Sequence, residues 1–205
     1  MSDTSALLAV KGLSYQTPDG RPLVGKLTFA IERGDLLAIT GPNGVGKSSL
    51  LRVVLGEHKP TSGSVKVQTS SISFLSQLHN REFHIPITVA DVLSFASTGR
   101  FDPETALNFG LLEKRELSLA WNSASGGERQ KTLLTQALLS DAELMIFDEP
   151  MNHLDSGARK KLMTILLDLV AAKKKGVLIV CHEEVGQEAF MSSAKTLELS
   201  RYVLQ

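Results

Sequence analysis

The chain lacks the cysteines of a disulfide-bonded protein and the excess of basic residues of a typical nucleic-acid binder. Of its 205 residues only Cys181 is a cysteine, so no disulfide can form within the chain and a reducing compartment is expected. Lys plus Arg and Asp plus Glu number 22 each, which gives a formal net charge of zero. Because nucleic-acid binders usually carry a basic excess, we expect no direct nucleic-acid partner. Little charge repulsion opposes self-association.

Long apolar runs and a basic leader are also missing. Apolar runs such as residues 176–181 are far too short to span a bilayer, and residues 1–5 lack the basic region of a signal peptide. Work at a membrane is therefore expected to pass through a partner. The hydrophobic content of 42% and charged content of 21% are ordinary for a globular protein.

Strand-like and helix-like segments alternate along the chain. Strands are expected at residues 8–10, 27–31, 36–40, 64–67, 72–75, 143–147 and 177–181, with closing strands at 196–199 and 202–204. Helices are expected at residues 47–55, 89–96, 103–111, 127–139 and 156–172, whereas 115–120 is ambiguous. The alternation predicts one α/β domain over residues 1–205, with a mostly parallel core sheet. We expect an N-terminal antiparallel β subdomain and an inserted helical lobe over about 78–122 that extends to about 140.

A glycine-rich loop follows the predicted strand at residues 36–40. Gly41 and Gly46 bracket four residues and Lys47-Ser48 follow, which is the pattern G-x-x-x-x-G-K-[ST]. Glycines allow backbone N–H groups to cradle phosphate, and the helix N-terminus adds a positive dipole end. We expect Lys47 to reach the β- and γ-phosphates and Ser48 to bind Mg²⁺. The predicted phosphate site comprises Gly41, Pro42, Asn43, Gly44, Val45, Gly46, Lys47, Ser48 and Ser49.

Two acidic residues end the apolar strand at 143–147. Asp148 can hold Mg²⁺ through water, and Glu149 can polarise an attacking water. The carboxyl end of a parallel strand is where this chemistry is expected, beside the phosphate loop.

A second anion-binding helix start is predicted at Ser125-Gly126-Gly127-Glu128. The serine hydroxyl and the free backbone N–H groups would face an anion. A chain with one phosphate loop and two such helix starts is most simply explained by a site that two subunits share.

Five motifs together resemble those of ABC-type ATPase subunits. They are residues 41–48 (Walker A), 125–128 (signature), 144–149 (Walker B), 152–155 (D-loop) and 181–183 (switch histidine). The resemblance covers roughly residues 8–190. It identifies Tyr15 as an adenine-stacking aromatic, Gln77 as the Q-loop glutamine and His182 as the switch histidine. The residues alone also allow a strand aromatic, a surface polar side chain and a capping histidine at these three positions.

The resemblance implies two copies closed head to tail on two ATP molecules. In each site Lys47 and the loop would hold the phosphates, while Ser48, Gln77 and Asp148 would place Mg²⁺. Glu149 would be the general base, and His182 would touch the γ-phosphate. The other subunit would supply the second half of the site, through Ser125, Gly126, Gly127 and Glu128, with Asp155 linking the two sites. The implied catalytic residues are Glu149, His182, Lys47 and Gln77.

The chain departs from the family pattern at four positions. Ala124 stands where Leu is usual, Glu128 where Gln is common, Met151 where Thr is common and Glu183 where Asp is usual. None of these changes removes a predicted phosphate contact.

Pro86-Ile87-Thr88-Val89, some nine residues after Gln77, resembles the ATPase subunits of zinc and manganese importers. It implies a separate integral membrane permease and a cytoplasmic position, peripheral on the inner face of the cell membrane. Only closing strands are expected after His182, with no regulatory domain. The residues also leave open another transported substrate or export, a soluble ABC protein acting on ribosomes or DNA, and a P-loop kinase.

Overall fold

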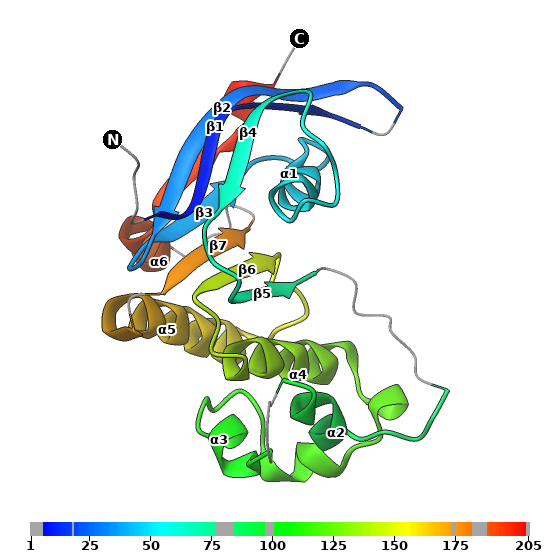
Figure 1. Cartoon of the computed structure of the whole chain (residues 1–205). Coiled ribbons are helices and arrows are strands. Elements are labelled where there is room, and N and C mark those ends of the chain that lie inside the picture. The colour runs from blue at the N-terminus through cyan, green and yellow to red at the C-terminus, as the bar shows by residue number, and fades with distance from the viewer. Residues whose placement is uncertain are drawn as a thin grey trace.

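The computed structural model of the chain describes residues 6–17, 19–76, 84–96, 101–173, 175–181 and 188–203. From top to bottom, Figure 1 shows an antiparallel sheet, a parallel sheet and a helical lobe. The arrangement is the predicted α/β fold with an N-terminal β subdomain. None of the helices in these ranges is both long and apolar enough to cross a membrane.

The antiparallel sheet has the strand order β2-β1-β4. These strands are β1 (Ala6–Gln16), β2 (Pro22–Glu32) and β4 (Ser62–Val67). The first two are longer than predicted because they pair along their whole length, across several register shifts. Their inward side chains, among them Val10 and Leu13, are fully buried.

The parallel sheet has the order β5-β6-β7-β3-β8. These strands are β3 (Leu36–Thr40), β5 (Ile72–Leu75), β6 (Leu144–Asp148), β7 (Gly176–Val180) and β8 (Lys195–Glu198). The three central strands are buried throughout, as their unbroken apolar sequences require when layers cover both faces.

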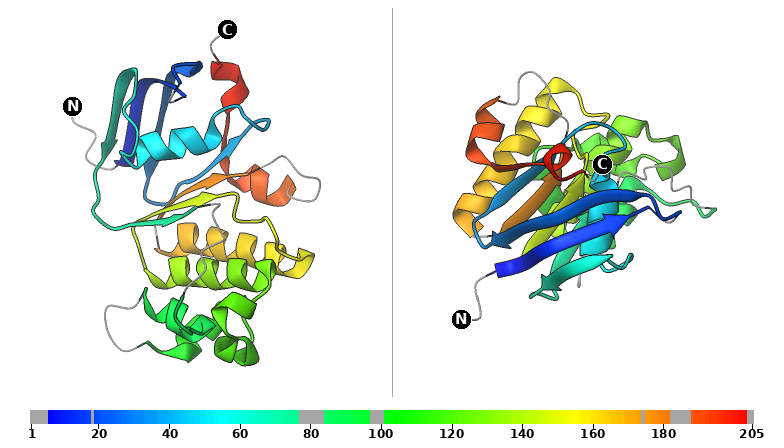
Figure 2. Two further views of the ribbon diagram at one scale, coloured as in Figure 1. Left: turned by 90° about the vertical axis from the view of Figure 1, so that its right-hand side faces the viewer. Right: turned by 90° about the horizontal axis from the view of Figure 1, so that it is seen from above.

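Alternate residues of β3 belong to two separate cores. Leu37 and Ile39 pack with the antiparallel sheet and α1 (Lys47–Val54), while Leu36 and Ala38 pack with the helices opposite. Figures 1 and 2 show α1 between the two sheets and the pair α4 (Gly126–Leu139) and α5 (Ser156–Lys173) on the far face. The short helix α6 (Glu188–Ser193) leads into β8.

The chain end differs from the prediction. The expected strand at 196–199 is confirmed as β8, but the one at 202–204 is wrong over its described residues. A 3₁₀ helix, η3 (Leu199–Tyr202), stands there, and Val203 makes only an isolated bridge to Val24. The Glu198 carboxylate accepts hydrogen bonds from Ser200 Oγ and Arg201 Nε, which favours a turn over an extended strand.

The helical lobe has a small core of its own, made by Val89, Leu93, Ala106, Leu112 and Leu117. Its elements are α2 (Val89–Ser94), α3 (Pro103–Leu107), η1 (Lys114–Ser118) and η2 (Trp121–Ser123), and α4 joins it to the parallel sheet. A capping box between Thr88 and Asp91 starts α2. The ambiguous stretch at 115–120 contains the 3₁₀ turn η1.

Candidate active site

The predicted phosphate loop connects β3 to α1. Gly46 is the N-cap of α1 at φ 107°, and no side chain caps the helix. A Cβ at Gly46 would lie 3.2 Å from Leu23 Cδ1 and 3.3 Å from Tyr15 Oη. Only glycine therefore fits the backbone conformation and the close packing. The first N–H groups of α1 are left for an anion.

Lys47, the first residue of α1, folds back across this loop. Its side chain is buried, and Nζ donates to the carbonyl oxygens of Gly41 at 2.8 Å and Pro42 at 3.1 Å. The ammonium group thus lies at the centre of the loop, where a point charge for phosphate is expected.

Asp148 lies at the end of β6, and its carboxylate hydrogen-bonds with Ser48 of α1. Strand β7 separates β3 from β6, so the two residues meet because parallel strands end at one edge. Burial raises the pKa of Asp148, and the Ser48 hydrogen bond opposes this rise. Among the described residues, Asp148 Oδ1 is buried without a hydrogen-bond partner. An orphaned carboxylate oxygen beside a hydroxyl fits Mg²⁺.

Glu149 follows in the left-handed region at φ 50°. Its N–H donates to Val180 O at 3.0 Å, and its Oε2 accepts from Asn152 Nδ2 at 2.7 Å. The carboxylate is thus held by a side chain from the next turn of the chain. Backbone strain of this kind is retained where the surrounding contacts enforce it.

One cavity of about 560 Å³ joins the phosphate loop, Lys47 and Glu149. It is lined by the phosphate loop, the Glu149 turn and the end of the β1–β2 hairpin: Thr17, Arg21, Leu23, Asn43, Gly44, Gly46, Lys47, Ser48, Ser49, Glu149 and Asn152. Sequence motifs pointed to the residues from Asn43 to Ser49 and to Glu149. The motifs did not point to the hairpin residues or to Asn152 as parts of the cavity. The sequence offered one signal for each: a turn sequence before Arg21, and the position of Asn152 inside the D-loop.

The expected role of Tyr15 as the adenine-stacking aromatic does not agree with the position of its ring. Its side chain is 1% exposed in the core, and its Oη donates to Gly46 O at 3.0 Å. Burial raises the pKa of the phenol, so it stays protonated as this donor. A ring enclosed in this way has no face on which adenine could stack. Tyr15 supports the phosphate loop from below, which accords with the strand-aromatic alternative.

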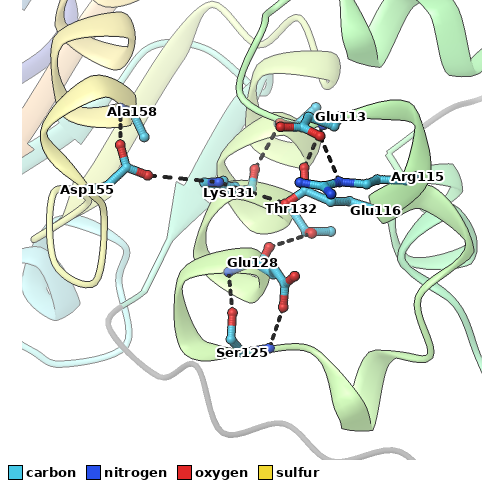
Figure 3. Close-up of polar contacts among 10 residues, drawn as sticks. Glu113, Arg115, Glu116, Ser125, Glu128, Lys131, Thr132, Asp155 and Ala158 are labelled. Carbon is cyan, nitrogen blue, oxygen red and sulfur yellow. Dashed lines mark hydrogen bonds and ion pairs between the residues drawn. The ribbon is translucent and has the colours of Figure 1, made fainter.

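The signature segment begins α4 with a capping box, drawn in Figure 3. Ser125 N–H donates to Glu128 Oε2 at 2.7 Å, and Glu128 N–H donates to Ser125 Oγ at 3.3 Å. Hydrogen bonds that the Ser125 backbone and side chain make to the Glu128 carboxyl group lower its pKa. Glu128, the residue that departs from the family pattern, thus makes a charged helix cap.

The D-loop packs against the signature helix. A Cβ at Gly127 would lie 3.0 Å from His153 O, so the two segments meet through glycine. Asp155 Oδ1 accepts from Ala158 N–H at 2.9 Å, and its Oδ2 lies 3.9 Å from Lys131 Nζ, as Figure 3 shows.

None of the four signature residues is among the described residues that line the phosphate-loop cavity. One chain therefore presents two separate halves of the predicted site. Two further predicted residues, Gln77 and His182, lie outside the described residues.

A sequence model of the ABC transporter family matches residues 24–152, more than half of the chain. The chain belongs to this family, as an ATP-binding subunit. ATP hydrolysis is the reaction of this ABC subunit.

Three relatives are similar over most of this ABC subunit. A Thermotoga maritima protein assigned to a metal transport system is 32% identical over 86% of this chain and 75% of its own length. The molybdate import ATP-binding protein of Haemophilus influenzae is 31% identical, over 95% and 79%. The zinc import ATP-binding protein of Psychrobacter cryohalolentis is 33% identical, over 89% and 76%.

Two solved structures are similar to the ABC subunit in fold and sequence. A dimeric bacterial ABC transporter cassette has a TM-score of 0.74 and 25% identity, over 94% of each chain. An inward-facing ABC transporter assigned to the metal-chelate type has a TM-score of 0.74 and 26% identity, over 95% of this chain and 80% of the other.

Proposed function

We propose that this ABC subunit is the ATP-driven motor of a metal-ion importer and works as a dimer on a separate membrane permease. The observation that carries the dimer is the separation of the signature helix start from the phosphate-loop cavity within one chain. A second copy placed head to tail brings each signature segment to the other copy's cavity. The cassette of similar fold was solved as a dimer.

Each residue then has a role at the shared site. Lys47 and the N–H groups of the phosphate loop hold the phosphates, and Glu149 accepts the proton of the attacking water. Ser48, Asp148 and Gln77 would hold Mg²⁺, which offsets the charge of the β- and γ-phosphates. By its resemblance to the family's switch histidine, His182 would contact the γ-phosphate.

The opposite subunit completes this site. Ser125 to Glu128 present a hydroxyl and helix-start N–H groups to the γ-phosphate. Asp155 couples the two sites. Loss of the γ-phosphate removes the bridge between the subunits, so hydrolysis opens the dimer.

Import of a metal ion is supported by the named activities of the relatives. Metal transport and zinc import are named for two of the three, and molybdate import for the other. The residues 86–89 also resemble zinc and manganese importers. The runner-up is another substrate, with molybdate, a metal oxyanion, as the first alternative.

A groove of about 420 Å³ between β5 and the helical lobe offers a docking place for the permease. Phe74 and Phe95 line it, and Phe95 is 65% exposed. An exposed phenylalanine at the edge of a groove is typical of a protein–protein contact. We expect a short helix of the permease to fill the groove, with the ATPase on the inner face of the cell membrane.

Deleting the gene should lower the cellular content of one metal, measured by mass spectrometry, because uptake needs the motor. A plasmid that encodes the intact chain should restore the metal content.

The Glu149→Gln variant should not restore the metal content, because it cannot hydrolyse ATP. Phe95→Asp should also fail while its own ATPase activity persists, because only docking is lost. Unchanged contents of zinc and manganese in the deletion strain would contradict metal-ion import, and a fall in molybdenum alone would favour the molybdate alternative.

A further inference from the structure

The hairpin end of the nucleotide cavity carries an arginine. We propose that the Arg21 guanidinium stacks on the nucleobase and replaces the aromatic ring that was expected at Tyr15. The inference rests on the proposed nucleotide site and assigns the base contact within it.

The order of the residues that line the cavity indicates where the nucleobase of a bound nucleotide would lie. Catalysis requires the γ-phosphate next to Glu149, on the β6 side of the loop. Helix α1 lies between β6 and the β1–β2 hairpin, as Figure 1 shows. A nucleotide whose phosphates occupy the start of α1 therefore points its nucleoside away from Glu149, toward Thr17 and Arg21.

The backbone at Arg21 is held firmly by Thr17. Thr17 N–H donates to Arg21 O at 2.9 Å, and Arg21 N–H donates to Thr17 Oγ1 at 3.0 Å. Gly20 N–H also donates to Thr17 O at 2.9 Å. The arginine side chain is exposed and lines both the main cavity and a neighbouring one of about 450 Å³ with Leu23. A fixed backbone thus presents a free planar group at the cavity edge.

Guanidinium chemistry suits this position. The group is planar and weakly hydrated and stacks on π faces, which every base presents. None of the described residues that line the main cavity is aromatic. Stacking reads the face of a base and not its hydrogen-bonding edge, so adenine and guanine are expected to bind about equally well.

A phosphate contact is the competing role for Arg21. The Asp19 carboxylate lies in the same turn and interacts electrostatically with the Arg21 guanidinium, which makes a phosphate contact by Arg21 less favourable. Hydrogen bonds from Thr17 and from its own backbone lower the pKa of Asp19, and the Arg21 charge adds to this effect. The turn is therefore close to neutral, which favours stacking over the capture of a phosphate that Lys47 already attracts.

The experiment is isothermal titration of the full chain with the magnesium complexes of ATP, GTP and inorganic tripolyphosphate. Arg21→Ala should bind ATP and GTP about five- to tenfold more weakly, because the stacking contact is lost. Its affinity for tripolyphosphate should match the wild type. Arg21→Trp should retain ATP affinity, because a ring can stack in place of the guanidinium.

Lys66→Ala serves as the matched control. It removes one positive charge from an exposed position on β4 and should leave all three affinities unchanged. An unchanged ATP affinity in Arg21→Ala, or an equal loss for tripolyphosphate, would overturn the base contact. A wild-type chain that binds neither ATP nor tripolyphosphate would instead overturn the proposed nucleotide site and the motor function that depends on it.

Discussion

At the scale of residues, the chain holds Glu149, the proposed general base, through its backbone and its carboxylate. The residue occupies a left-handed backbone conformation and shares its carboxylate with Asn152, at 2.7 Å. Asn152 also lines the cavity. Its amide holds one oxygen of the carboxylate, so we expect Asn152 to orient Glu149 as the proposed general base.

Asn152→Ala should lower kcat about tenfold and leave KM for ATP nearly unchanged, because orientation of the base matters in the transition state and little in binding. Steady-state ATPase assays measure both constants. Asn108→Ala, at the exposed C-cap of α3, is the control and should change neither. A higher KM with an unchanged kcat would show instead that Asn152 serves binding.

The sequence predicted the residues that lie within contiguous motifs. Lys47, Ser48 and Asp148 have the expected positions because a strand–loop–helix unit and a strand end place them locally. Arg21 enters the cavity only because the hairpin folds over the phosphate loop. Tyr15 was assigned wrongly because register along β1 decides whether its ring points to the core or the cavity.

At the scale of elements, α4 connects the signature segment to the catalytic turn. Gln130 Nε2 donates to Pro150 O at 2.8 Å, directly after Glu149. Lys131 lies 3.8 Å from Glu116 of the lobe and 3.9 Å from Asp155 of the D-loop. One helix therefore contacts the turn after Glu149, the helical lobe and the D-loop.

Glu128→Ala should lower the free energy of unfolding by about 1 kcal/mol at pH 7, because the charged cap of α4 is lost. A carboxylate whose pKa falls on folding stabilises the folded state above its unfolded pKa, and this contribution disappears as the pH falls through the folded value. The difference in unfolding free energy between Glu128→Ala and the wild type should therefore become smaller below about pH 4.

Urea unfolding at several pH values measures this deficit. Glu128→Gln should keep part of the cap through its amide oxygen, without the pH dependence. Glu57→Ala, at an exposed position in the loop after α1, is the control and should cost little. A deficit equal at all pH values would contradict a role for the carboxylate charge.

Elements with strong periodicity were predicted well, and those that depend on partners were not. The fully apolar strands β3, β6 and β7 and helix α5 stand where the sequence placed them. Strands β1 and β2 extend far beyond their apolar runs because pairing along the hairpin satisfies their backbone groups. At the chain end, η3 forms where a strand was expected at 202–204, because the Glu198 carboxylate makes local hydrogen bonds that favour a turn.

At the scale of the whole molecule, the chain presents its phosphate loop and its signature helix start as two separate surfaces. In the proposed dimer, each site combines the phosphate loop of one copy with the signature segment of the other. We propose that ATP bridges two copies of the chain and that hydrolysis of ATP separates them.

Light scattering after gel filtration of Glu149→Gln with Mg²⁺ and ATP tests this claim most directly. Hydrolysis is blocked, so the γ-phosphate remains and the protein should elute at twice the mass of the monomer. ADP should leave it monomeric. Adding Ser125→Glu should abolish the dimer, because a carboxylate repels the γ-phosphate at the shared site. A Glu149→Gln protein that stays monomeric with saturating ATP would contradict the account.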